Sequence, residues 1–201
     1  MSAKLVVLIS GNGSNLQVIL DACADRSLPA SVVAVISNIS SAFGLSRAEK
    51  AGVRAIVIPK LANESRHDYD CRLAGEVTSL QADYVVLAGW MRLLTSAFLE
   101  RFPGRVINLH PALPGTFPGT HSIERAYDAF LRGEIDRSGV MVHLVPDEGV
   151  DNGPVLASRE IFFQPGEPLE QFEVRVHAVE HALLLETLKN LVSGSLNSSL
   201  I

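Results

Sequence analysis

The feature that most constrains the fold of this chain is the alternation of short apolar runs with longer amphipathic stretches in its first half. The apolar runs have the length of β-strands and occupy residues 5–9, 31–37, 53–58 and 84–88. Helical patterns separate them, at residues 15–24, 44–51 and 65–80. Val, Ile and Leu occupy both faces of these strands, as in parallel sheets that helices cover on both sides. The order predicts repeated β-α-β units with right-handed crossovers.

The second half of the chain continues this pattern. It predicts strands at residues 106–109, 140–145 and 155–163, and helices at 122–132 and 169–192. The last helix has a core-facing stripe formed by Phe172, Val176, Val179, Leu183 and Leu184. We therefore expect an α/β fold with a doubly wound, mostly parallel sheet and helices on both faces. Residues 1–201 are expected to form a single domain.

The composition argues against several classes of protein. The 201 residues carry a formal net charge of −5 and no cluster of Lys and Arg, which disfavours binding to nucleic acid. The first apolar run is too short to span a membrane. Cys23 and Cys71 are isolated, as reduced core cysteines are, so neither a disulfide framework nor a zinc site is expected. We expect a cytoplasmic protein.

A glycine-rich loop at residues 10–15, which reads Ser-Gly-Asn-Gly-Ser-Asn, lies between the first strand and the first helix. Glycines let a backbone approach a ligand closely, and free N–H groups at a helix start attract an anion, so this loop suits a phosphate. It is not a dinucleotide fingerprint, because Leu16 stands at the position of the third glycine, and no Lys follows as in a P-loop. The alternative is a tight turn in which Asn15 caps the helix.

Asn108 and His110 end an apolar strand, in the sequence Asn-Leu-His-Pro. Alternation puts both side chains on one face, and the carboxyl end of a parallel strand faces the crevice where such sheets bind ligands. The Asn108 amide can donate to a carbonyl oxygen that becomes negative, and the His110 imidazole can donate or shuttle a proton near neutral pH. The alternative is a hydrogen-bonded strand end without a chemical role.

An acidic loop at residues 146–154, Pro-Asp-Glu-Gly-Val-Asp-Asn-Gly-Pro, directly follows the strand that ends at Val145. A carboxylate in this loop can orient an imidazole and raise its pKa. The chain has no G-x-S-x-G nucleophile elbow and no reactive cysteine context. These residues favour direct attack by a substrate amine over a covalent enzyme intermediate. The alternative for the loop is a solvated turn.

Two further patterns concern a metal and a flat ligand. His177, Glu180 and His181 match an H-x-x-E-H zinc motif, but Glu186 is the main further acidic candidate, so no metal is expected. Trp90 follows the fourth predicted strand, where a cleft would open, and its apolar surface suits a flat heterocycle. The alternative for Trp90 is a core position.

Taken in order, these motifs resemble those of the glycinamide ribonucleotide (GAR) formyltransferases, a family of folate-dependent enzymes of purine synthesis. The resemblance runs from about Leu5 to Leu191. It rests on residues 9–15, 108–111 and 147–154, on Leu-Ala-Gly-Trp-Met-Arg at 87–92, and on Arg175 and Glu180-His181. One departure lies at residues 112–116, where Ala-Leu-Pro-Gly-Thr replaces the Ser-Leu-Leu-Pro and basic residue of many members.

The resemblance implies a Rossmann-like formyltransferase fold and a metal-free transfer of the formyl group of 10-formyltetrahydrofolate, a co-substrate, to the amine of GAR. It gives the catalytic roles to Asn108, His110 and Asp151. Asn108 and protonated His110 would stabilise the tetrahedral oxyanion, while Asp151 supports that protonation and helps a proton reach the leaving nitrogen. The N-terminal half would bind phosphate, and the C-terminal half would carry the folate and catalytic loops.

The resemblance also implies binding residues. The phosphate of GAR would be held by Gly13, Ser14 and Asn15, and its ribose or glycinamide end by Glu180. The folate would be held by Arg66, Met91, Arg92, Leu93, Leu94 and Asn108. The expected partners are these small molecules, with no nucleic acid and no membrane, and the chain would act as a monomer or homodimer.

Three other functions were considered, and each would require sequence features that differ from those of the transferase. A formyltetrahydrofolate deformylase would carry a regulatory domain before a first strand that here begins by residue 5. A methionyl-tRNA formyltransferase would add a C-terminal RNA-binding domain and a basic surface. A non-catalytic nucleotide-binding module would use the glycine loop but would leave Asn108, His110 and Asp151 unexplained. The transferase is the expected function, with the deformylase and the binding module as alternatives.

Overall fold

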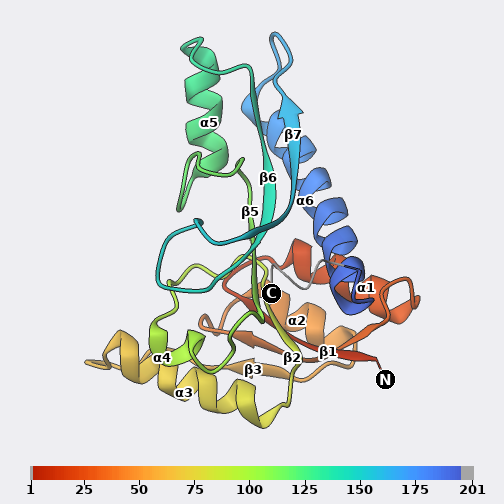
Figure 1. The fold of residues 1–201 in the computed structure, drawn as a ribbon, viewed down its shortest axis with the longest axis vertical. Coiled ribbons are helices and arrows are strands. Elements are labelled where there is room, and N and C mark those ends of the chain that lie inside the picture. Colours follow the sequence, from red (N-terminus) through yellow and green to blue (C-terminus); the bar gives the residue numbers. More distant parts are fainter. Residues whose placement is uncertain (1, 196–201) are drawn as a thin grey trace.

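A computed structural model of the chain describes residues 2–195. A single sheet of seven strands, in the order β3-β2-β1-β4-β5-β6-β7, runs through these residues (Figure 1). The strands are β1 (Ala3–Ile9), β2 (Ala30–Ser37), β3 (Ala55–Val57), β4 (Tyr84–Leu87), β5 (Val106–His110), β6 (Arg137–Leu144) and β7 (Val155–Phe162). The helices are α1 (Ser14–Ala24), α2 (Phe43–Lys50), α3 (Arg66–Ser79), α4 (Ser96–Leu99), α5 (Ser122–Leu131) and α6 (Leu169–Val192).

The strand pairing divides the sheet into two parts. From β3 through β2, β1 and β4 to β5, every neighbouring pair is parallel, whereas β6 is antiparallel to β5 and β7 is antiparallel to β6. The predicted α/β fold with a mostly parallel sheet is confirmed. The β6–β7 pair is joined by a loop, as antiparallel neighbours can be, whereas β5 and β6 are antiparallel although helix α5 lies between them in the chain.

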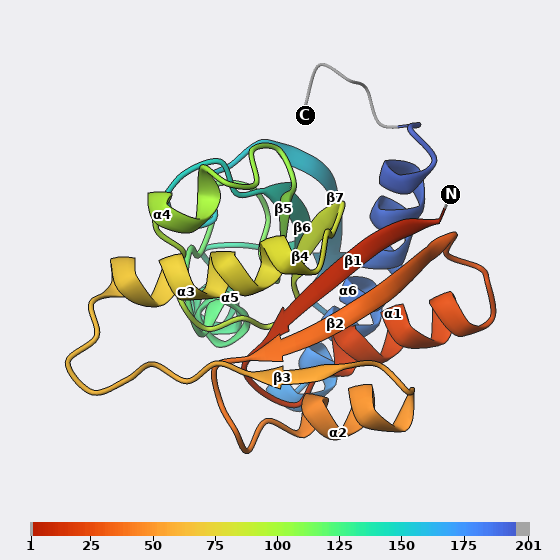
Figure 2. The same ribbon diagram turned by 90° about the horizontal axis from the view of Figure 1, so that it is seen from below.

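Helices cover both faces of the sheet, and each face has its own core (Figure 2). One core packs α1, α2, α5 and α6 against the sheet and includes Leu16, Phe172 and Leu184, which are fully buried. The other packs α3 and α4 and includes the buried Tyr69 and Phe98. In the predicted stripe of α6, Val179 is only partly buried, and the other members are buried.

The short helix α4 is an element that the sequence did not predict. Its residues form a single turn, which is too short to show a helical period. The turn is held from outside by Asp70 of α3, whose carboxylate accepts hydrogen bonds from the backbone N–H and the hydroxyl of Thr95, at 2.6 and 2.7 Å. The sequence shows no sign of this interaction, because the two residues lie far apart in the chain.

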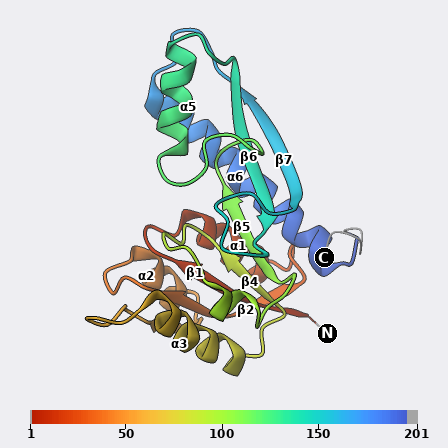
Figure 3. The same ribbon diagram turned by 60° about the vertical axis from the view of Figure 1, so that its left-hand side comes forward.

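The antiparallel strands β6 and β7 extend with α5 away from β1, β2 and β3 (Figure 3). Helix α6 packs along β6 and β7 at one end and against α1 at the other, so it joins the two parts of the molecule. The β4–β5 region lies between them. Within residues 2–195, no helix is long and apolar enough to cross a membrane.

Candidate active site

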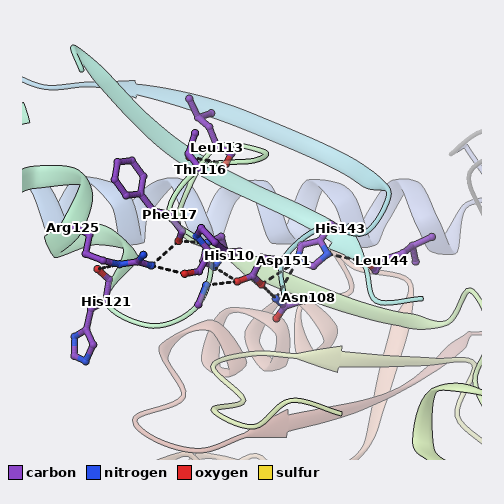
Figure 4. A network of polar contacts seen from close by, with 12 residues as sticks. Asn108, His110, Leu113, Thr116, Phe117, His121, Arg125, His143, Leu144 and Asp151 are labelled. Atoms are coloured by element: carbon purple, nitrogen blue, oxygen red, sulfur yellow. Dashed lines mark hydrogen bonds and ion pairs between the residues drawn. The ribbon is translucent and has the colours of Figure 1, made fainter. Parts of the chain in front are cut away.

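The end of β5 and the acidic loop meet in a largely buried group of polar side chains, Asn108, His110 and Asp151, here named the polar cluster (Figure 4). Asp151 Oδ1 accepts a hydrogen bond from Asn108 Nδ2 at 3.0 Å, and Asp151 Oδ2 lies 3.3 Å from His110 Nδ1. The side chains of His110 and Asp151 are 6% and 10% exposed. The shared strand face expected for Asn108 and His110 therefore brings both to one carboxylate.

Asp151 is held in place by its backbone and by a neighbouring loop. Its φ angle of 51° is a left-handed conformation that few non-glycine residues adopt, and it turns the side chain inward from the acidic loop. The backbone N–H of Gly119 donates to Asp151 Oδ2 at 2.8 Å. A cavity of about 320 Å³ lies beside Asp151, between the loops that carry Thr116 and Val150. The acidic loop is therefore not a solvated turn at this position.

The second nitrogen of His110 also has a partner. Its Nε2 lies 3.1 Å from the carbonyl oxygen of Phe117, which accepts a further hydrogen bond from Arg125 Nη2 at 2.8 Å (Figure 4). Arg125 also donates to the carbonyl of Pro118 at 2.6 Å. Arg125 thus fixes the backbone segment that contacts His110.

The ionisation of the polar cluster follows from burial and close charges. Burial lowers the pKa of His110 below its ordinary value, although Asp151 and the Phe117 carbonyl raise it. Burial raises the pKa of Asp151, but the His143 ring, the Gly119 N–H and the His110 ring bring it below its ordinary value overall. The contribution of Asp151 to His110 has the expected sign. The pKa of His110 is nevertheless lowered overall, because desolvation is the larger influence.

His143 of β6 adjoins the polar cluster and was missed by the sequence prediction. Its side chain is 2% exposed, and its Nε2 lies 3.1 Å from Asn108 Nδ2 and 3.5 Å from Asp151 Oδ1. The antiparallel register places His143 directly opposite Asn108. A usable signal was present in the sequence, since His143 is the polar exception in the apolar run Val-Met-Val-His-Leu-Val at residues 140–145.

The glycine loop forms a second cavity, of about 210 Å³, lined by residues 10–15 together with Ala88, Gly89 and Met91. Gly13, at φ 75°, is the N-cap residue of α1, and no side chain forms a capping hydrogen bond to this helix. A side chain on Gly13 would bring its Cβ within 2.9 Å of Gly44 Cα, so the turn requires glycine. Ser10 Oγ accepts from the backbone N–H of Met91 at 2.9 Å, which joins the loop to the segment after β4.

Asn15 does not cap the helix, contrary to the alternative considered for the glycine loop. Helix α1 begins at Ser14 after the cap residue Gly13, and no side chain caps it. The Asn15 Oδ1 atom is buried and has no hydrogen-bond partner within the described residues. A buried amide oxygen without a partner is uncommon in a folded protein, and a donor group of a ligand would satisfy it.

The segment after β4 presents a mixed surface. Met91 and Leu93 are 68% and 48% exposed, whereas Trp90 is buried in the core beneath α3. The flat-ligand role considered for Trp90 is therefore wrong, and exposed apolar surface is supplied by its neighbours. Arg92 lies over the Tyr69 ring at 4.5 Å, and Leu94 is buried.

Arg66 links this segment to the acidic loop. Its Nη2 lies 3.5 Å from the Leu93 carbonyl oxygen and 3.9 Å from Glu148 Oε2. Glu148 also accepts from the backbone N–H of Ser96 at 3.0 Å. The structure therefore brings Arg66 to the Met91–Leu94 segment, as expected for residues that share a ligand.

Glu180 of α6 is buried and accepts a hydrogen bond from His177 Nδ1 at 2.6 Å. This hydrogen bond raises the pKa of His177 above its ordinary value. The hydrogen-bond partner of Glu180 thus lies on its own helix and not in the glycine loop. Among residues 2–195, no group of three or more His, Cys, Asp or Glu side chains is arranged to hold a metal ion.

A family model described as formyl transferase matches residues 3–188 of the chain. Among curated proteins, the phosphoribosylglycinamide formyltransferase of Dictyostelium discoideum is 42% identical, over 94% of this chain and 98% of that protein. The protein of the same name from Escherichia coli is 41% identical, over 90% of this chain and 82% of its own length.

Solved structures agree with the sequence comparisons. The crystal structure of glycinamide ribonucleotide transformylase 1 from Symbiobacterium toebii superposes with a TM-score of 0.89. It is 37% identical and covers 96% of this chain and 88% of its own. Phosphoribosylglycinamide formyltransferase from Bacillus halodurans also has a TM-score of 0.89, at 31% identity over 97% of this chain and 98% of its own.

Proposed function

The chain belongs to the formyl transferase family, and from this membership we propose that it transfers the formyl group of 10-formyltetrahydrofolate to the amine of GAR. The products are formylglycinamide ribonucleotide and tetrahydrofolate, in purine synthesis. The observation that supports this reaction best is the convergence of Asn108 and His110 on the buried carboxylate of Asp151. An amide donor and an imidazole–carboxylate pair suit the addition of an amine to a formyl carbon.

The phosphate of GAR binds, in this proposal, in the glycine-loop cavity. Backbone N–H groups at the start of α1 favour an anion, and Gly13 leaves room for it to approach. Ser14 and Asn15 line the same cavity; Nδ2 of Asn15 is the atom that can donate to phosphate, and its partnerless Oδ1 supports a contact with a donor group of the ligand. Glu180 is proposed to contact the ribose or glycinamide end.

The folate binds beside this cavity in the same proposal. The exposed apolar side chains of Met91 and Leu93 offer a surface for its ring system, and the backbone from Met91 to Leu94 offers hydrogen-bonding groups. Arg66, which lies near the Leu93 carbonyl, offers a positive charge for the glutamate tail. Asn108 contacts the formyl end. Because Ser10 bonds to Met91, the two ligand sites adjoin.

The chemical step uses all three members of the polar cluster. The GAR amine adds to the formyl carbon, and the Asn108 NH₂ donates to the oxygen that becomes negative. Burial lowers the pKa of His110, and once the substrate replaces the Phe117 carbonyl, Nε2 takes a proton from the attacking nitrogen while Nδ1 keeps its hydrogen toward Asp151. Asp151 stabilises the imidazolium so formed. His110 then delivers the proton to the leaving nitrogen of the folate, and no metal takes part.

The wider setting is also proposed. Residues 1–201 form one domain whose N-terminal half binds phosphate and whose C-terminal half carries the folate and catalytic loops. The chain works in the cytoplasm on small molecules, without nucleic acid, as a monomer or homodimer. The net charge of −5 and the free Cys23 and Cys71 support this setting.

The test is an assay of tetrahydrofolate release with and without GAR. Release should rise with GAR and saturate, because the phosphate site places the amine by binding energy remote from the reacting atoms. Glycinamide without its phosphoribosyl group should be a poor substitute. Release at the full rate without an amine would identify a deformylase and would overturn the transferase proposal. A nucleotide-binding module would bind GAR in calorimetry but ignore a folate analogue.

A further inference from the structure

One buried histidine next to the polar cluster has no task in the reaction described above. We propose that His143 is a positioning residue, whose Nε2 accepts a hydrogen bond from the Asn108 amide and thereby sets which way that amide faces. The inference rests on the proposed function, because it takes Asn108 to bind the formyl oxygen. The first support is the sheet register, which holds His143 directly opposite Asn108.

The hydrogen on the His143 ring is fixed by the partner of Nδ1. This nitrogen lies 2.8 Å from the carbonyl oxygen of Leu144, which can only accept, so Nδ1 carries a hydrogen. Gly153 leaves space for that carbonyl, since a side chain at this position would collide with it. The backbone of Leu144 is itself held by its N–H, which donates to the Pro154 carbonyl at 2.9 Å. The acceptor of Nδ1 is therefore firmly placed.

The orientation of the Asn108 amide follows from its other neighbour. Asp151 Oδ1 lies 3.0 Å from one terminal atom of the amide, and an ionised carboxylate only accepts, so that atom is Nδ2. The same Nδ2 lies 3.1 Å from His143 Nε2. Because Nδ2 can only donate, Nε2 must accept, which requires a ring with hydrogen on Nδ1 alone. The two conclusions about the ring agree.

Other protonation states leave like groups in contact. A hydrogen on His143 Nε2 would face the Asn108 NH₂ at 3.1 Å. Turning the amide would remove this conflict, but it would then put the amide oxygen 3.0 Å from Asp151 Oδ1. Buried polar groups that face each other in this way are unfavourable. One arrangement satisfies the hydrogen bonds at Asn108 Nδ2 and His143 Nδ1: His143 with hydrogen on Nδ1, and the NH₂ of Asn108 shared between His143 Nε2 and Asp151 Oδ1, two acceptors that lie 3.5 Å apart.

This arrangement explains how Asn108 can serve the reaction. Of its two amide hydrogens, one points to His143 and the other to Asp151, on the side where His110 lies. When the formyl oxygen becomes negative, it accepts the second hydrogen in place of Asp151, and the amide does not turn, so His143 keeps the first. Without an acceptor at Nε2, the amide is free to turn its own oxygen toward the site, where it would repel the oxyanion.

The ring state can be measured in the unaltered protein by long-range ¹H–¹⁵N NMR correlation of the histidine side chains, with His143→Asn used for assignment. The expected spectrum shows His143 protonated at Nδ1 and unprotonated at Nε2. A hydrogen on Nε2 in the resting protein would overturn the inference. This measurement does not depend on the reaction, so its result stands even if the assay with GAR were to refute the transferase proposal.

Two matched variants separate positioning from a structural role. His143→Asn retains a donor near Nδ1 but removes the Nε2 acceptor, whereas His143→Gln offers an oxygen near the position of Nε2. We expect His143→Asn to lower kcat roughly tenfold or more, with little change in the KM for GAR, as misplaced catalytic groups do. His143→Gln should recover most of the rate. Thermal unfolding of each variant measures any loss of stability separately.

A double-mutant cycle completes the test. In an Asn108→Ala background, His143→Asn should cause little further loss of kcat, because the amide that it positions is absent. An equal loss in both backgrounds would mean that His143 acts only on the structure of the site, and would overturn the inference. Equal kcat values for His143→Asn and the unaltered protein would do the same.

Discussion

The glycine-loop cavity and the polar cluster differ in the parts of the chain that build them. The cavity is lined mainly by one continuous segment, residues 10–15, and its shape comes from backbone at Gly13. The cluster takes Asn108 and His110 from β5 and Asp151 from a distant loop, and the Gly119 backbone holds it. A local backbone turn suits the binding of one charged group. Side chains that restrain each other suit a chemical step, so changes in the two regions should separate binding from rate.

The largest expected effect comes from removing a side chain of the polar cluster. His110→Ala or Asn108→Ala should lower kcat by roughly a hundredfold or more, because the first removes the group that carries the proton and the second removes the donor to the oxyanion. Binding of GAR, measured by calorimetry, should change little, because the phosphate site lies elsewhere. Near-normal turnover in either folded variant would remove that residue from the mechanism and would break the division between the two regions.

The next largest effect is expected for Asp151→Asn. The Asp151 charge raises the pKa of His110, so removing it should lower that pKa further and move the His110 limb of the pH–rate profile to lower pH. The rate near neutral pH should fall roughly tenfold or more, because the imidazolium loses its partner. Kinetics from acid to neutral pH, with GAR binding as the control, test this. An unchanged profile and rate would show that Asp151 does not act through His110.

A smaller effect, on binding rather than on rate, is expected in the cavity. Asn15→Ala should raise the KM for GAR roughly tenfold, since a hydrogen bond to a charged group is lost, while kcat should stay close to normal. Asn15→Asp, which has the same size, should raise it further because a carboxylate repels phosphate. Steady-state kinetics at varied GAR decide this. A fall in kcat with an unchanged KM would place Asn15 with the chemistry instead.

No effect at all is expected from exhaustive chelation. His177 and Glu180 bond to each other, and no third ligand accompanies them within residues 2–195. Activity after dialysis against a strong chelator should equal that of the untreated protein. Stoichiometric zinc by elemental analysis, with activity lost on its removal, would contradict this expectation.

The same contrast explains what the sequence could predict. The glycine loop was recognisable because its residues are consecutive and the required backbone conformation favours glycine. The elements with a clear period were also found, including α6 at its observed bounds of Leu169–Val192. For Asn108 and His110, strand alternation was enough to predict a shared face.

What the sequence could not predict depends on contacts between distant segments. The position of His143 opposite Asn108 requires the antiparallel register of β5 and β6, which apolar runs alone do not specify. The single turn α4 depends on Asp70, and the contact of His110 with Phe117 depends on Arg125. The net direction of the His110 pKa could not be predicted, because it is set by burial, which a sequence does not display.

The Phe117 carbonyl that contacts His110 behaves as an internal competitor for any substrate that uses the same nitrogen. The Phe117 carbonyl belongs to the same polypeptide and is held near His110 by Arg125, so its effective concentration at His110 does not depend on the protein concentration. The contribution of this contact to the substrate affinity is then the strength of the new hydrogen bond at His110 less that of the bond to Phe117 that is broken. A change such as Arg125→Ala, which loosens the grip on Phe117, would therefore strengthen binding without adding any interaction with the ligand. Natural selection on the segment that carries Phe117 would therefore act on the substrate-free enzyme as much as on the substrate-bound enzyme.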